Sequence, residues 1–242
     1  MATRDRGRFI PQALGCFAAQ TYPFRELIVV DDGEVSVKGL CEGVAGVRYL
    51  RLDRRTPTGR KLNLGFECAR GSILQKLDDD DYYGPGFLAT AAGRMETSRW
   101  RRAIAAWDCF LIHLAGSAEL RFSGHGWLAG GTLCFRREVW ESGPFRAVAR
   151  DEDAMFLEDH PGRRLRVADA PEQYVLVRHG RNTWNRFRTG ADVDRFLRGL
   201  SVYPKTLEEV AGPEAAGFYS GLSGVATGRR RASRRCRSAR QG

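Results

Sequence analysis

The sequence predicts an α/β protein built on a doubly wound, mostly parallel sheet that is flanked by helices. Strand-like and helix-like segments alternate through residues 1–100, which is typical of such sheets. Two apolar segments, 26–30 and 72–77, each run into consecutive aspartates, as strands do when they end at a ligand-binding edge. Hydrophobic residues make up 43% of the 242 positions, enough for a substantial core.

Local patterns give the elements of the first half in order. Pro11 suits the first turn of a helix, and the apolar side chains that follow it share one face. Gly71 is a suitable C-terminal cap for a later helix. The expected order is helix, strand, strand, helix, strand and helix, at residues 12–20, 26–30, 47–52, 62–69, 72–77 and 85–97.

The second half is less regular. Residues 122–131 are rich in glycine and aromatic residues and predict a flexible loop, of the kind that covers a substrate. Strands are expected at 132–136 and 174–179, and a polar helical region at 183–212. We expect a single domain over residues 1–227, with one half at about 1–100 and the other at about 101–227.

The net charge of +10 is concentrated at the C-terminus, where residues 228–242 hold seven arginines and no acid. We expect this tail to be disordered. The remaining +3 gives little support for a nucleic-acid-binding protein. The apolar stretch 103–116 is interrupted by Asp108 and His113, so no membrane span is predicted. Scattered cysteines and the lack of a secretory signal favour a cytoplasmic protein, with at most peripheral contact at the inner membrane face through the tail.

The four aspartates Asp78 to Asp81 directly follow the expected strand at 72–77. Neighbouring carboxylates repel one another by roughly 1 kcal/mol in water and about 4 kcal/mol at an effective dielectric of 20. A divalent cation relieves this repulsion, and hard cations prefer carboxylate oxygen. A solvated acidic turn is the alternative. A calcium EF-hand loop does not fit, because Tyr83 and Ala89 stand at its glycine and glutamate positions.

Other chemical motifs are missing or misplaced. Residues 124–129 match the dinucleotide pattern GxGxxG/A, but they run into two further glycines and an expected strand rather than opening a helix. The sequence contains no P-loop, no HExxH motif and no serine in a GxSxG elbow.

Several segments in order resemble family 2 glycosyltransferases with the GT-A fold, over about residues 1–185. Residues 20–33, QTYPFRELIVVDDG, closely resemble the second-strand signature of that family. The later matching segments are 63–65 with 69–71, then 77–81, 130–133, 152–153 and 179–183.

The resemblance makes about 1–100 the nucleotide-binding half and about 101–227 the acceptor-side half, and it implies roles for residues on the donor side. Asp32 is expected to read the nucleotide base, and Thr3, Lys61 and Asp78 to contact the nucleotide sugar, although Lys61 also suits a solvated helix face. Asp80 is expected to hold Mn²⁺ or Mg²⁺, with His179 as a second ligand. A packed or surface histidine is the alternative for His179. Asp31, beside Asp32, is expected to be structural. Asp79 and Asp81, on either side of Asp80, are expected to be solvated or structural.

On the acceptor side, the resemblance makes Asp153 the general base and places Glu152 beside it. The alternative for Asp153 is an acid at a helix N-terminus, which the helix dipole favours. Trp127 is expected on the acceptor side, since aromatic rings stack on sugars. Packing in the core or at an interface is its alternative.

The resemblance therefore implies metal-dependent transfer of a sugar from a nucleotide-diphosphate sugar, expected to be UDP-linked, to an acceptor hydroxyl with inversion. The acceptor is not identified by the sequence. The rivals are a truncated, non-catalytic relative that binds nucleotide or a partner, and a sugar-phosphate nucleotidyltransferase. The family has a full apolar first strand before the segment that resembles residues 2–6. Either the true start of the protein therefore lies upstream of Met1, or the protein has lost most of this strand.

Overall fold

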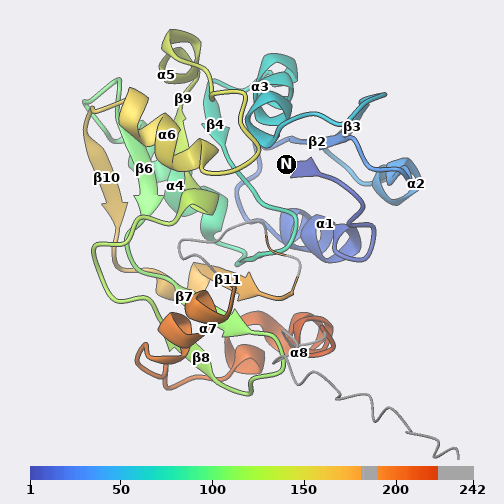
Figure 1. The fold of residues 1–242 in the computed structure, drawn as a ribbon. Helices are drawn as coiled ribbons and strands as arrows, with labels where there is room; N and C mark the ends of the chain where they lie inside the picture. Colours follow the sequence, from blue (N-terminus) through green and yellow to red (C-terminus); the bar gives the residue numbers. More distant parts are fainter. Residues whose placement is uncertain (181, 183–189, 223–242) are drawn as a thin grey trace, which may run out of the picture.

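The computed structural model describes residues 1–180, 182 and 190–222 (Figure 1). The expected tail at 228–242 and part of the expected helical region at 183–212 lie outside the described residues. Helices and strands alternate through the first hundred residues, as predicted, and the strands form three sheets rather than one.

The first sheet is entirely parallel and has the order β1-β2-β3. Its strands are β1 (Ala2–Thr3), β2 (Leu27–Asp31) and β3 (Val47–Arg51). α1 (Ile10–Ala18), with proline in its first turn, packs its apolar face on β2 and near α2 (Lys38–Cys41). β1 pairs with only the last two residues of β2, and a cavity of about 670 Å³ lies beside the rest of β2.

The second sheet has the order β10-β6-β9-β4. Its strands are β4 (Ile73–Gln75), β6 (Ile104–Trp107), β9 (Cys134–Arg136) and β10 (Arg164–Val167). β6 and β10 are parallel, whereas β9 runs antiparallel to both β4 and β6. The helices of this part, at the top of Figure 1, are α3 (Thr58–Cys68), α5 (Arg137–Ser142) and α6 (Glu152–Asp159), and a core dominated by Phe and Leu joins them to the sheet.

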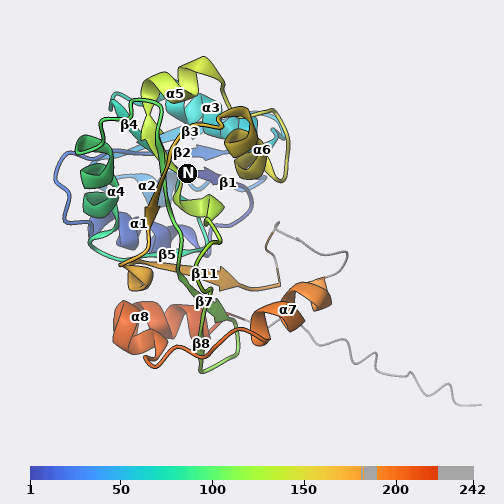
Figure 2. The same cartoon turned by 90° about the vertical axis from the view of Figure 1, so that its left-hand side faces the viewer.

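The third sheet has the order β5-β11-β7-β8. Its strands are β5 (Tyr82–Tyr83), β7 (Leu111–Leu114), β8 (Leu120–Phe122) and β11 (Tyr174–Arg178). α7 (Gly190–Arg198) and α8 (Leu207–Ser220) lie at this end of the molecule, on the far side from the first sheet (Figures 1 and 2).

The remaining elements lie on or beside the second and third sheets. α4 (Phe87–Glu96) packs on the second sheet. Two short 3-10 turns, η1 (Gly130–Thr132) and η2 (Pro171–Gln173), precede β9 and β11.

The apolar stretch at 103–116 forms β6 and β7, both fully buried. None of the helices in the described part of the chain combines the length and the apolar character that a membrane crossing requires. The expected helical region at 183–212 includes α7 within its described part, whereas α8 begins only at Leu207 and has a break at Gly212.

Candidate functional site

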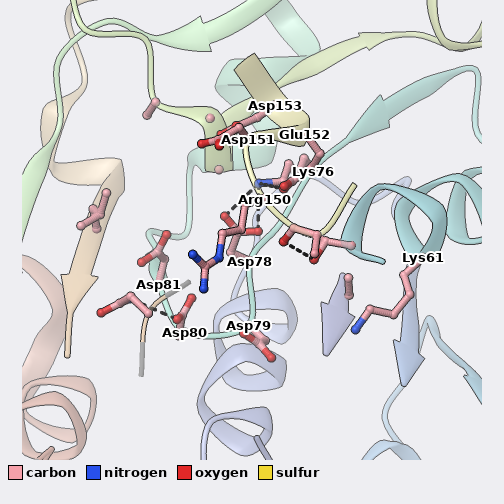
Figure 3. Close-up of a pocket in the computed structure, with 18 of the residues that line it drawn as sticks. Lys61, Lys76, Asp78, Asp79, Asp80, Asp81, Arg150, Asp151, Glu152 and Asp153 are labelled. Carbon is pink, nitrogen blue, oxygen red and sulfur yellow. Dashed lines mark hydrogen bonds and ion pairs between the residues drawn. The ribbon is translucent and has the colours of Figure 1, made fainter. Parts of the chain in front are cut away.

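A cavity of about 890 Å³ lies where the ends of β1 and β4 face the first turn of α6. Its lining includes the whole acidic run that follows β4, the acidic first turn of α6, and part of the glycine-rich segment before β9 (Figure 3). The residues that the sequence predicted for the site and that line the cavity are Thr3, Lys61, Asp78, Asp80, Trp127, Glu152 and Asp153.

Lys61 and Asp32 form a buried ion pair at the end of β2. The Lys61 ammonium lies 2.7 Å from Asp32 Oδ1 and 2.9 Å from the Thr3 carbonyl oxygen. The Thr56 backbone N–H donates to the other Asp32 oxygen at 2.6 Å. Asp32 is absent from the cavity lining, but Lys61, Thr56 and Thr3 all line it, so the carboxylate lies one contact away from the cavity. Lys61 is buried rather than on a solvated helix face.

Asp80 is the centre of a charged network on the side of the cavity that is formed by the segment after β4. Its Oδ2 accepts from the Arg6 guanidinium at 2.5 Å and lies 3.0 Å from His179 Nε2. Burial acts against its charge, but Arg6 and His179 together hold the pKa of the Asp80 carboxyl below its usual range. The His179 ring stacks on Phe9, with centroids 4.7 Å apart, and is buried. β11 thus brings His179 to an aspartate that is far away in the sequence.

Asp79 and Asp81, on either side of Asp80, are buried and accept hydrogen bonds from the protein. Asp79 accepts from the Thr3 hydroxyl at 2.6 Å and from Arg6 at 2.7 Å. Asp81 accepts from the Tyr174 hydroxyl at 2.6 Å and from the Val177 backbone at 2.8 Å. Burial raises the pKa of both carboxyls, and that of Asp81 is raised further by the neighbouring carboxylates. Both have the contacts of structural residues, and neither is part of a solvated turn.

The residues suit a divalent cation by donor type. A carboxylate oxygen of Asp80 and an imidazole nitrogen of His179 face each other, and magnesium sites commonly combine one or two carboxylates with substrate phosphates. Arg6 donates to the same Asp80 oxygen, so a cation that binds there competes with the guanidinium. Within the described residues, no group of three or more His, Cys, Asp or Glu side chains could hold a metal by itself. The remaining ligands would therefore come from groups such as substrate phosphates and water.

α6 and η1 also contribute residues to the wall of the cavity. Glu152 and Asp153 occupy the first turn of α6, so Asp153 is an acid at a helix N-terminus and also lines the cavity. Its Oδ1 accepts from the Ala154 backbone at 2.8 Å. Gly130 lies directly beneath its other oxygen: a β-carbon on Gly130 would come within 1.5 Å of Asp153 Oδ2.

Trp127 lines the cavity from the loop between β8 and η1. Its ring also packs on Phe110 with centroids 5.0 Å apart, which is the packing named above as the alternative for this residue. The loop is held by Asp108, whose Oδ1 accepts from the Gly126 backbone at 2.8 Å.

Sequence reasoning missed several polar residues that line the cavity, among them Arg6, Lys76, Arg150 and Asn182. Lys76 carried a signal, since a lysine inside an apolar strand segment is buried only when it is paired. Arg6 and Asn182 carried none, because their partner Asp80 is distant in the sequence.

Residues 1–110 match the family model described as "Glycosyl transferase family 2". No curated protein matches the chain. Among solved structures the chain is similar to S. aureus TarS, with 17% identity and a TM-score of 0.59 over 73% of this chain and 35% of that one. Two structures of TarS 1–349, in complex with UDP and with UDP-GlcNAc, each give 18% identity and a TM-score of 0.56 over 74% of this chain, and over 59% and 58% of theirs.

The chain thus spans less than two thirds of the structures it matches, and at these identities the likeness shows the fold alone. The expected mixed α/β architecture with a parallel sheet flanked by helices is confirmed, and its structural neighbours are of the GT-A type.

Proposed function

We propose, from the match of residues 1–110 to the model of glycosyl transferase family 2, that the protein transfers a sugar from a nucleotide-diphosphate sugar to an acceptor hydroxyl. The observation that carries the proposal is the cavity of about 890 Å³, which brings the acidic run after β4 and the acidic first turn of α6 to opposite sides of one space. Because TarS has been solved with UDP and with UDP-GlcNAc, we take UDP as the expected nucleotide.

The donor would lie along the ends of β1, β2 and β4. Lys61 is buried and directed at Asp32, so we assign this pair to the end of the site that recognises the nucleotide base. Thr3 and Asp78 line the cavity between that pair and Asp80, which suits contacts to the ribose and the first phosphate. Arg6 and Lys76 add positive charge beside the expected diphosphate.

A divalent cation, Mn²⁺ or Mg²⁺, would be held by Asp80 and His179. When bound, it would stabilise the negative charge that builds on the leaving diphosphate. The chain's own part is to fix the two ligands: Phe9 packs on the His179 ring, and Asn182 donates to Asp80 Oδ2 at 3.3 Å.

Asp153 would act as the general base. Its carboxylate lines the cavity and is oriented by the Ala154 N–H and by the bare backbone of Gly130. From there it would take the proton of the acceptor hydroxyl as the new glycosidic bond forms. Attack from the α6 side, opposite a diphosphate held near Asp80, gives inversion at the anomeric carbon. We propose further that residues 1–227 work as one unit, with the donor bound by the first half and the acceptor by the second.

Calorimetric titration with UDP, in the presence and absence of Mn²⁺, tests the proposal. We expect UDP binding that depends on the metal and is lost in Asp80→Ala. That variant removes a proposed metal ligand and takes away the Asp80 carboxylate that pairs with the Arg6 guanidinium. The control is Asp169→Ala, which removes an exposed carboxylate paired with Arg94 at 2.8 Å and should bind UDP like the wild type.

Hydrolysis of a panel of UDP-sugars then separates a transferase from a non-catalytic relative. A folded protein that binds UDP but turns over no donor would favour the non-catalytic relative. A folded protein that binds no UDP at all would refute the proposal.

A further inference from the structure

Lys76 is a buried lysine between the donor side and the acceptor side of the cavity (Figure 3). Its ammonium lies 3.1 Å from the Asp78 carboxylate, on the segment after β4, and 3.5 Å from Glu152 Oε1 on α6. The lysine side chain is 4% exposed and that of Glu152 is 10% exposed. Burial opposes the charge of Lys76, but these two carboxylates raise its pKa, so the lysine is charged at neutral pH.

We propose that Lys76 is a positioning residue that fixes the first turn of α6, and with it Asp153, relative to the donor-side carboxylate Asp78. The inference deepens the function proposed above and rests on it, since Asp153 is the base only if sugar transfer takes place here.

The backbone of Lys76 supports the same arrangement. Its N–H donates to the Leu133 carbonyl at 2.8 Å, directly after η1. η1 begins at Gly130, the residue on which the Asp153 carboxylate rests. Lys76 therefore holds η1 with its main chain and α6 with its side chain, and Asp153 lies between these two contacts.

Charge explains why a neutral residue cannot replace Lys76. Burial raises the pKa of the Glu152 carboxyl, and the Lys76 ammonium partly offsets that increase. Without the ammonium, Glu152, Asp153 and Asp78 would repel one another across a poorly hydrated space. The repulsion would push the first turn of α6 outward. A displacement of about 1 Å at a catalytic group can cost roughly 100-fold in rate.

A double-mutant cycle with Lys76→Met and Glu152→Gln tests the proposal, because both changes break the same contact. We expect each single variant to lower kcat roughly 10- to 100-fold. The double variant should be no worse than the poorer single variant. In Glu152→Gln, affinity for UDP in the presence of Mn²⁺ and KM for the donor should stay within about threefold of wild type, since none of the proposed donor ligands is altered in that variant. Glu152→Gln is the milder change and tests the contact even if Lys76→Met does not fold.

The matched control is the exposed pair Lys205 and Glu172, 2.8 Å apart and remote from η1 and α6. Lys205→Met, Glu172→Gln and their double variant should leave kcat unchanged. Urea unfolding of all variants gives a second cycle that does not depend on activity.

Each result has a distinct meaning. If the factors by which the two single variants lower kcat simply multiply in the double variant, the positioning role is refuted. The role is also refuted if the two changes are non-additive in the free energy of unfolding but independent in kcat, because the contact would then serve stability alone. A folded wild type that binds UDP and turns over no donor would instead refute the proposed function, and the catalytic role of Lys76 with it.

Discussion

The carboxylate of Asp153 rests on the α-carbon of Gly130, so closely that a β-carbon at that position would lie 1.5 Å from Oδ2. The two residues come from different elements, α6 and η1, and the orientation of the carboxylate depends on the absence of a side chain beneath it.

We predict that Gly130→Ala lowers kcat roughly 10- to 100-fold, because the new methyl group must displace the Asp153 carboxylate. Gly130 has no positive φ, so the effect is one of space and not of backbone strain. UDP affinity, measured by calorimetry, should be close to wild type. The control is Gly93→Ala in α4, where a β-carbon has no neighbour within 4 Å. Equal kcat for Gly130→Ala and wild type would contradict the claim that Gly130 fixes the orientation of the Asp153 carboxylate.

Lys61 and Asp32 should depend on each other for stability. Lys61→Met leaves the fully buried Asp32 carboxylate without its ammonium at 2.7 Å. Removing one partner of a buried ion pair typically costs about 3–5 kcal/mol, and we expect a loss of this size in the free energy of unfolding, measured in urea.

Arg60→Met, at an exposed position on the same helix, is the comparison for this variant. It should change stability by less than about 0.5 kcal/mol. If Lys61→Met were equally mild, the buried pair would contribute nothing.

The Tyr174 hydroxyl should stabilise the protein through Asp81. Tyr174→Phe keeps the ring in the core but removes the donor 2.6 Å from Asp81 Oδ2, leaving the Val177 backbone as the other donor. We expect the free energy of unfolding to fall by about 1–3 kcal/mol, the usual cost of an unsatisfied buried polar group. Tyr22→Phe is a suitable control, because its hydroxyl bonds Glu96 at an exposed site. A similar small loss in both variants would argue against the prediction.

Asp31 should contribute an acid-sensitive part of the stability. Burial opposes its charge, but the backbone N–H of Gly33, the Tyr49 hydroxyl, the Val37 N–H and Arg51 together lower its pKa from the usual 3.8. Since the folded pKa lies below the unfolded one, the contribution is complete above about pH 4 and is lost as the pH falls through the folded value.

Urea unfolding of wild type and Asp31→Asn, between about pH 6 and about pH 2, checks this prediction. The stability difference between the two proteins should be largest above about pH 4 and should shrink below it. A difference that stays constant with pH would show that the Asp31 charge makes no pH-dependent contribution.

Much of the first half could be predicted from the sequence, because its signals are local. Pro11 in the first turn of α1 and the apolar run of β2 specify their elements without any distant contact. The acidic run was correctly placed after a strand, although β4 ends at Gln75 and Asp78 follows three residues later. β6 and β7 were missed because a fully buried run of apolar residues has no alternation that distinguishes a strand from a helix.

The site was only partly predictable, because its contacts join distant segments. The resemblance named Asp80 and His179, but no local pattern shows that they meet. Lys76 gave a readable hint as a charge in an apolar run, whereas its second partner, Glu152, became visible only in three dimensions. The close approach of Gly130 to Asp153 was also hidden, since a pair of glycines in sequence equally suits an ordinary loop.

The contact between Asp80 and His179 spans 99 positions of the chain. During synthesis, the two residues that bond the Asp32 carboxylate, Thr56 and Lys61, are both present once the first 61 residues have left the ribosome. The Asp80–His179 contact must wait for the residue that follows β11, and closing a loop of that length costs more entropy. Long-range contacts of this kind slow folding, so in a nascent chain the partners of Asp32 are available well before the histidine partner of Asp80.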